Sequence, residues 1–218
     1  MKIDRESDFA GALIDGCRQL GLNLDNQKIE LLLAYHQLLV KWNKAYNLTA
    51  VRDPMQMIAR HLLDSLSIVP YLRGERFIDV GTGAGLPGLV LAIVFPSKQF
   101  DLLDSAGKKM RFLFQVKTDL KLDNVAIHHC RVETFTPAQL FDGVISRAFA
   151  SLSDMVTDCG HLLKKEGYFF AMKGQWPEEE LLHLKKLSDG QKNYNVEAFH
   201  KLQVPGEEGQ RHLLLISQ

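Results

Sequence analysis

The segment Phe77-Ile78-Asp79-Val80-Gly81-Thr82-Gly83-Ala84-Gly85-Leu86-Pro87-Gly88 decides the fold of this chain. A short run of strand-forming residues leads directly into three glycines within five residues, and an apolar helix pattern follows. Glycines allow a tight turn and a close approach of backbone to a ligand, and the positive end of the next helix faces that ligand. A turn without a ligand would gain nothing from three glycines, because each costs backbone entropy. The segment therefore predicts a ligand-binding turn between a strand and a helix.

Strand and helix patterns alternate along the chain on both sides of this segment. Strands are predicted at 76–80, 99–103, 125–128, 143–146 and 168–172, helices at 108–120, 152–163 and 178–187, and two consecutive strands at 195–202 and 212–216. Alternation is typical of a mostly parallel sheet covered by helices on both faces, and the last two strands, joined at Pro205-Gly206, form an antiparallel hairpin. The predicted fold class is α/β, a Rossmann-like and mostly parallel seven-stranded sheet with a C-terminal antiparallel hairpin.

The first third of the chain has helical patterns only. Asp25 or Asn26 is suited to cap a helix that carries apolar residues at spacings of three and four, and another helical stretch follows Asp53-Pro54. We therefore expect residues 1–74 to form an N-terminal helical extension packed on the core, and residues 75–218 to form one compact catalytic domain.

Composition narrows the class of protein. The chain has 218 residues, is 46% apolar and has a formal net charge of zero, which argues mildly against a protein that coats RNA generally. Cys17, Cys130 and Cys159 are odd in number and far apart, so neither a disulfide framework nor a metal site is expected. The charged N-terminus and the absence of a long apolar run predict a cytoplasmic protein that does not enter a membrane.

Two acidic residues indicate which ligand the glycine turn binds. A glycine-rich turn alone does not separate NAD, FAD and S-adenosylmethionine sites. Asp79 stands two residues before Gly81, where a negative charge suits a ligand with an ammonium and a sulfonium better than a pyrophosphate. Asp104 ends the next predicted strand, where an acid can accept hydrogen bonds from ribose hydroxyls or can instead cap the following helix. A terminal hairpin also favours a methyltransferase sheet over a dehydrogenase sheet, and S-adenosylmethionine is the expected cofactor.

Several longer motifs resemble one family. They are Lys41-Trp42-Asn43-Lys44-Ala45-Tyr46-Asn47-Leu48-Thr49, Arg60-His61-Leu62-Leu63-Asp64-Ser65, the glycine turn, Leu103-Asp104-Ser105, Arg131-Val132-Glu133 and Ser146-Arg147-Ala148-Phe149-Ala150. In this combination the chain resembles the bacterial small-subunit (16S) rRNA guanine-N7 methyltransferases, historically called glucose-inhibited division protein B. The resemblance runs from Lys41 to Gly174. It implies a class I S-adenosylmethionine-dependent methyltransferase that acts on 16S rRNA or the small ribosomal subunit.

The resemblance also implies which residues bind the cofactor. The family's positions fall on Gly81, Leu86, Val132, Glu133 and Arg147. With the residues taken from the turn itself, the predicted cofactor site is Asp79, Gly81, Gly83, Gly85, Leu86, Asp104, Val132, Glu133 and Arg147. Without the resemblance, a surface carboxylate is a serious alternative for Glu133. The alternative for Arg147 is a surface salt bridge, but a guanidinium at the end of a strand of this sheet more often meets a carboxylate or a phosphate, which favours a role in binding.

The expected chemistry needs no catalytic side chain. Guanine N7 carries a lone pair and no proton, so no general base is required, and catalysis comes from alignment, to which Arg147 can contribute. Enzymes that methylate exocyclic amines typically carry an Asn/Asp-Pro-Pro-Tyr/Phe tetrapeptide after the fourth strand, and this chain has Ser146-Arg147-Ala148-Phe149 there. Pyrimidine C5 methyltransferases need a cysteine nucleophile near the same strand, and no cysteine lies there. Phe149 is a candidate for stacking on the target base, or simply a core aromatic.

Basic residues on one predicted helix are the candidates for RNA contact. Lys108, Lys109, Arg111 and Lys117 lie there, with Lys121 at its end, and a second edge comprises Lys41, Lys44, Arg52 and Arg60. Such charged helix faces are often merely solvated.

A monomer is expected, and two alternative functions remain. One is a methyltransferase of the same fold that acts on a small molecule or a protein, and the other is a nucleotide-binding regulatory module.

Overall fold

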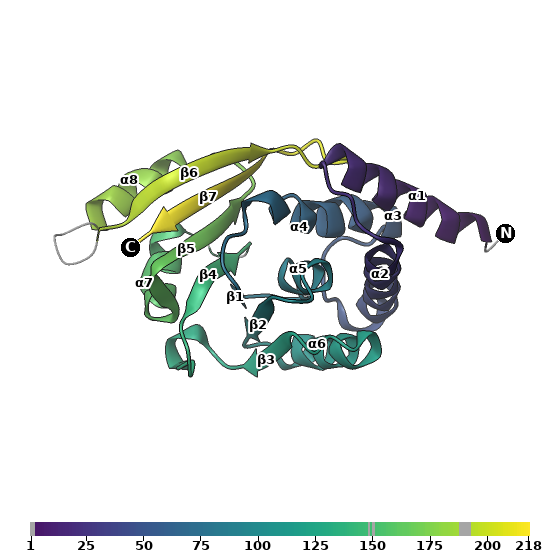
Figure 1. Ribbon diagram of the computed structural model, residues 1–218, viewed down its shortest axis with the longest axis horizontal. Coiled ribbons are helices and arrows are strands. Elements are labelled where there is room, and N and C mark those ends of the chain that lie inside the picture. The colour runs from purple at the N-terminus through teal and green to yellow at the C-terminus, as the bar shows by residue number, and fades with distance from the viewer. Residues whose placement is uncertain (1–2, 148, 150, 188–192) are drawn as a thin grey trace.

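A computed structural model describes residues 3–147, 149, 151–187 and 193–218. Its strands form one sheet in the order β3-β2-β1-β4-β5-β7-β6 (Figure 1). The strands are β1 Arg76–Val80, β2 Gln99–Asp104, β3 Val125–His129, β4 Phe141–Ser146, β5 Leu163–Lys173, β6 Asn195–Leu202 and β7 Arg211–Ser217. Neighbours from β3 to β5 are parallel, whereas β7 is antiparallel to both β5 and β6. The predicted mostly parallel seven-stranded sheet with a C-terminal hairpin is confirmed.

Helices cover both faces of the sheet. One face carries α1 Ile3–Gln19, α2 Asn26–Tyr46, α5 Gly88–Val94 and α6 Gly107–Leu120, and the other carries α7 Leu152–Cys159 and α8 Glu178–Leu187. Side chains alternate along a strand. Phe77 and Phe170 therefore pack beneath the first group of helices, whereas Ile78 and Phe169 pack beneath the second. The glycine turn follows β1, the middle strand of the five parallel ones, and so lies between these two cores.

The N-terminal helices pack directly on the first face. Asp25 caps α2 by accepting a hydrogen bond from the Lys28 amide, as the sequence predicted. A second helical stretch begins at Asp53, which caps α3 Pro54–Met57, continues through a π-helical segment, Ile58–Leu63, and ends with α4 Asp64–Leu66. The Tyr35 hydroxyl on α2, which is fully buried, donates to the Ala84 carbonyl at 2.8 Å. The helical extension thus supports the glycine turn from beneath.

One predicted boundary is wrong. The apolar pattern of 152–163 predicted a helix to Leu163 and a strand only from Tyr168, but α7 ends at Cys159, a 3₁₀ turn spans Gly160–Leu162, and β5 begins at Leu163. Leu163 pairs with Phe141, and regular pairing resumes at Tyr168 after an irregularity. The exposed, charged residues 164–166 lie in this irregular part, so the strand shows no alternation of polar and apolar residues there.

The remaining short segments are 3₁₀ turns at Val69–Tyr71 and Val132–Thr134. Cys17, Cys130 and Cys159 are free thiols, and Cys17 and Cys159 are buried in the core. Within the part of the chain that the structure describes, no helix combines the length and apolar character needed to cross a membrane.

Candidate functional site

The glycine turn adopts backbone angles that favour glycine at three positions. Gly81, Gly83 and Gly85 have φ angles of 73°, 61° and 89°. Their surroundings differ. A Cβ at Gly83 would meet no atom closer than 3.9 Å, whereas at Gly85 it would overlap Leu89 and approach Leu113. Gly83 therefore faces open space where a ligand has room, and Gly85 serves the packing of the following helix.

Asp79 holds the turn from inside. Its Oδ2 accepts hydrogen bonds from the Thr82 hydroxyl at 2.7 Å and from the Gly88 amide at 2.8 Å, and the residue is 1% exposed. A Cβ at Gly88 would lie 2.8 Å from that oxygen, which explains the fourth glycine of the segment. Oδ1 is buried and has no hydrogen-bond partner among the described residues. Asp79 therefore orders the turn, and one of its oxygens remains available.

The burial of Asp79 predicts a measurable pH dependence. Desolvation raises the pKa of this carboxyl to about 6, although Thr82 and Gly88 oppose the shift. Because the folded protein binds this proton more tightly than the unfolded chain does, protonation of Asp79 stabilises the fold. This contribution is complete below the pKa of the unfolded state and is lost as the pH rises through 6. Relative to Asp79→Asn, the unfolding free energy of the wild-type protein should rise by roughly 1 kcal/mol between pH 7 and pH 5. Denaturant titrations at both pH values measure this difference, and parallel behaviour of the two proteins would contradict it.

A pocket of about 300 Å³, here called the glycine-turn pocket, opens where β1, β2 and β3 end. Its lining includes Gly81, Asp104, Val132 and Glu133, four of the residues predicted to bind the cofactor, together with Cys130 and Arg131. The carboxyl ends of parallel strands are where open α/β sheets bind ligands. The structure thus brings together in one pocket residues that lie up to 53 positions apart, from Val80 to Glu133.

Asp104 is anchored on both oxygens. Oδ2 accepts from the Gly83 amide at 2.9 Å and from Lys109 Nζ at 3.3 Å, and Oδ1 accepts from the Ala106 amide at 2.9 Å. Asp104 does not occupy the cap position of α6, which is Ala106, but it holds the amide of that residue. Its bond to the Gly83 amide fixes the turn. A carboxylate has about four acceptor sites, so room for a hydroxyl donor remains. Lys109, predicted to contact RNA, is instead partly committed to this carboxylate.

The other predicted residues are distributed around this centre. Gly85 and Leu86 are buried in the core and do not line the glycine-turn pocket. On α6, Lys108 and Arg111 are exposed and Lys117 is half-buried. Phe149 packs against the core beside α7, in keeping with the core-aromatic reading.

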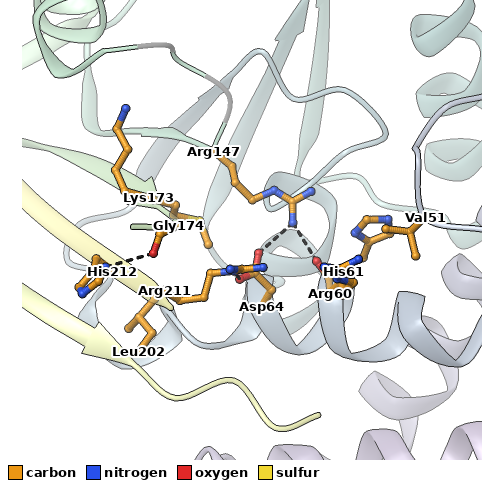
Figure 2. Close-up of a pocket in the computed structure, with 11 residues that line it drawn as sticks. Val51, Arg60, His61, Asp64, Arg147, Lys173, Gly174, Leu202, Arg211 and His212 are labelled. Carbon is orange, nitrogen blue, oxygen red and sulfur yellow. Dashed lines mark hydrogen bonds and ion pairs between the residues drawn. The ribbon is translucent and has the colours of Figure 1, made fainter. Parts of the chain in front are cut away.

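Arg147 lines a second pocket, of about 350 Å³, here called the arginine pocket (Figure 2). Its Nη1 donates to Asp64 Oδ2 at 2.9 Å and to the Arg60 carbonyl at 3.2 Å. The preceding residue, Ser146, bonds through Oγ to the Val80 carbonyl at 2.9 Å, and Val80 lines the glycine-turn pocket. The two pockets therefore flank the ends of β1 and β4, where the order of the sheet reverses.

The motifs behind the family resemblance converge on this region. The side chain of Asn43 is buried and ties the end of α2 to the next loop through the Thr49 amide and the Val51 carbonyl. The Thr49 hydroxyl lies 2.9 Å from His61 Nε2, and His61 lines the arginine pocket. Burial and the charge of Arg147 lower the pKa of His61 to about 4, so its ring is neutral at pH 7. Asp64, three residues later, then binds Arg147.

Three residues of this region were not identified as functional from the sequence: Asp64, Glu207 and Arg211. Asp64 and Arg211 pair at 2.9 Å although 147 residues separate them, and Glu207 pairs with Arg60. Asp64 was noted only as part of the motif from Arg60 to Ser65, and no local sequence pattern indicated a role for Arg211 or Glu207. Among the described residues, no group of three or more His, Cys, Asp or Glu side chains is arranged to hold a metal ion.

Comparisons with known proteins identify relatives of this chain. Residues 28–214 match the family model described as rRNA small subunit methyltransferase G. The chain is 53% identical over 209 residues to the ribosomal RNA small subunit methyltransferase G of Stutzerimonas stutzeri, covering 95% of this chain and 94% of that one. It is 55% identical over 208 residues to the protein of the same name from Pseudomonas aeruginosa, with 95% and 94% covered.

A solved structure supports the fold independently. A SAM-dependent methyltransferase from Aquifex aeolicus superimposes with a TM-score of 0.56 at 17% identity, covering 76% of this chain and 94% of that one. The family match spans the glycine turn, both pockets and the motifs that join them, and so this chain belongs to the rRNA small subunit methyltransferase G family.

Proposed function

We propose that the protein transfers a methyl group from S-adenosylmethionine to N7 of a guanine in 16S rRNA of the small ribosomal subunit. The observation that carries the proposal is the glycine-turn pocket, held by Asp79 and Asp104, in a chain of this family. Its neighbour, the arginine pocket, supplies a cationic surface suited to RNA beside it.

The residues of the glycine-turn pocket fit the cofactor. Gly81 lines this pocket and has a positive φ angle, and Gly83, two residues later, has a positive φ angle and open space where a Cβ would be. Backbone can therefore approach a ligand closely along this turn. In the proposal, Asp104 accepts from ribose hydroxyls, Val132 and Glu133 contact the adenine, and Arg147 contacts the methionine carboxylate. The buried Oδ1 of Asp79 is a candidate acceptor for the ammonium, directly or through water. The cofactor supplies an electrophilic methyl group on a sulfonium.

The chain's own contribution to the reaction is alignment. Guanine N7 has a lone pair and no proton, so no side chain needs to act as a base. In the proposal, therefore, no side chain acts as a general base. His61, which is neutral at pH 7, has its Nε2 within hydrogen-bond distance of the Thr49 hydroxyl. Residues around the two pockets hold the base and the cofactor in line and limit the access of water.

We also propose that the protein acts as a monomer in the cytoplasm, without a metal ion. Residues 1–74 serve in this proposal as an extension that supports the catalytic unit 75–218, because Tyr35 bonds the glycine turn. Sedimentation of the purified protein tests its oligomeric state.

Methyl transfer is tested with labelled S-adenosylmethionine and three acceptors: small ribosomal subunits, naked 16S rRNA and a mixture of cellular proteins and small molecules. Label should enter the RNA, and chemical cleavage at N7-methylguanine followed by reverse transcription should locate one guanine. Transfer only to the third acceptor would favour another methyltransferase of this fold, and cofactor binding without transfer would favour a regulatory module.

Replacing Asp104 tests its proposed role in ribose binding. Asp104→Ala should weaken S-adenosylhomocysteine binding by roughly 1–3 kcal/mol, because hydroxyl donors and the Gly83 amide lose their acceptor. Calorimetric titration measures the affinity. Asp101→Ala on the same strand is the matched control, since Asp101 pairs with His128 and does not line the pocket. In Asp104→Ala, a cofactor analogue without the 2′ and 3′ hydroxyls should bind almost as well as the cofactor itself. If removal of these hydroxyls still causes the full loss of affinity in the variant, Asp104 only holds the turn and the next helix.

A further inference from the structure

The arginine pocket contains an ordered network of charges. Asp64 bridges Arg147 and Arg211, each at 2.9 Å, and Glu207 bridges Arg60 at 2.7 Å and Arg211 at 3.4 Å. We call these five residues the arginine array. Both carboxylates are well buried, with side-chain exposures of 2% for Asp64 and 8% for Glu207. Three guanidinium groups against two carboxylates leave an excess positive charge at the pocket.

The three arginines have different numbers of free donors. Arg211 uses all three nitrogens, on Asp64, the Gln210 carbonyl and Glu207. Arg60 uses only Nε on Glu207, so among the described residues both of its terminal nitrogens have no acceptor. Arg211 is therefore a connector within the array, whereas Arg60, whose side chain is 47% exposed, presents unused donors to solvent.

Glu207 restrains the guanidinium of Arg60. It accepts from the Arg60 side chain and the Gly209 amide, and these bonds with nearby charges keep the pKa of the Glu207 carboxyl below its ordinary value. Glu207 lies in the connection between β6 and β7, 147 residues from Arg60. A guanidinium held at one edge keeps its outer edge in a fixed orientation, which suits two-pronged binding of an oxyanion.

We propose that the outer edge of Arg60, oriented by Glu207, which Arg211 also contacts, binds a phosphate of the RNA next to the target guanine. This inference rests on the proposed function and assigns a phosphate site to the RNA side of the reaction centre. The same chemistry would suit the carboxylate of the cofactor. RNA is the source favoured here, because Arg60 does not line the glycine-turn pocket and is the most exposed arginine of the array.

The first test is Arg60→Gln, with Arg18→Gln as its matched control. Arg18 is also an exposed helical arginine paired with one carboxylate, Asp15, but it lies on α1 outside both pockets. In Arg60→Gln, the KM for small-subunit RNA should rise at least about tenfold with kcat little changed, because the charge-assisted, two-pronged contact to the phosphate is lost. The slope of log affinity against log salt should become shallower by about 0.7 to 0.9. Arg18→Gln should change neither quantity.

The second test is Glu207→Gln, which separates orientation from net charge. This variant adds positive charge to the pocket, so a merely electrostatic surface would bind RNA more tightly. If Glu207 orients Arg60, the KM for RNA should instead rise several-fold despite the added charge. Thermal unfolding of each variant identifies any general loss of fold.

The cofactor alternative is tested in the absence of RNA. Calorimetric titration with S-adenosylhomocysteine should give the wild-type affinity in Arg60→Gln, and a tenfold loss there would assign the oxyanion site to the cofactor carboxylate and overturn the proposal. An unchanged KM and salt slope in Arg60→Gln would also overturn it. Filter binding to 16S rRNA tests the two proposals separately. If the wild-type protein binds RNA but does not methylate it, the proposed function is contradicted. The RNA affinity of Arg60→Gln, compared with that of the wild-type protein, still tests the phosphate site.

Discussion

Replacing Gly81 by valine should abolish binding of S-adenosylhomocysteine, with a loss of more than about 100-fold in affinity. Gly81 has a φ of 73° and lines the glycine-turn pocket, and its amide donates to the Leu103 carbonyl at 2.9 Å. A β-branched residue is strained at this φ, and its branches would occupy the space that a ligand needs. Calorimetric titration measures the affinity, and thermal unfolding measures the cost to the fold.

A matched control separates strain from the loss of the binding site. Gly21 has the same φ of 73°, and a Cβ there would meet no atom within 4 Å. It lies just after α1 and lines neither pocket. Gly21→Val should therefore lower stability by a comparable amount while cofactor affinity remains normal. Normal affinity in Gly81→Val as well would show that the glycine turn is not the cofactor site.

The second large effect is expected at Arg147. Arg147→Ala should lower kcat/KM for methylation of ribosomal RNA by about 100-fold or more, the range for removing one member of a buried charge pair. The loss has two sources. The arginine pocket loses one of its guanidinium groups, and Asp64, whose side chain is 2% exposed, keeps only Arg211 as an ion-pair partner. Arg73→Ala, at an exposed arginine that lines neither pocket, is the control.

A conservative change distinguishes the two roles available to Arg147. Lysine keeps the charge but cannot reproduce two-pronged binding. If Arg147 holds the methionine carboxylate, as we expect, Arg147→Lys should weaken S-adenosylhomocysteine binding with RNA absent. If it holds RNA, that affinity should be unchanged while KM for RNA rises. Normal methylation by Arg147→Ala would remove both roles and leave Arg147 with only its ion pair to Asp64.

The elements with strong local signals were predictable from the sequence. Strand β1 and the turn at Gly81, Gly83 and Gly85 follow from a buried strand that meets glycines at fixed spacing. The hairpin of β6 and β7 follows from two strand patterns around Pro205-Gly206. Both depend on neighbours in the chain, whose periodicity and turn chemistry can be read in order. The start of β5 was not predictable, because the irregular pairing between Leu163 and Tyr168 interrupts the alternation.

Whether a given charged side chain has a partner was decided by the tertiary structure alone. Lys109 stood in a basic run that suggested RNA contact, yet the fold turns it toward Asp104. Three distant parts of the chain supply the arginine array: the Ile58–Leu63 segment with α4, the residue after β4, and the β6–β7 connection with the start of β7. The ion pairs among Arg60, Asp64, Arg147, Glu207 and Arg211 form only because these parts converge. An ion pair between distant residues leaves no periodic trace in sequence, because Coulomb attraction depends on separation in space. The sequence alone therefore determined the sheet, the glycine turn and the class of ligand, whereas the folded chain decided which charged side chains pair with each other and which keep free hydrogen-bond donors.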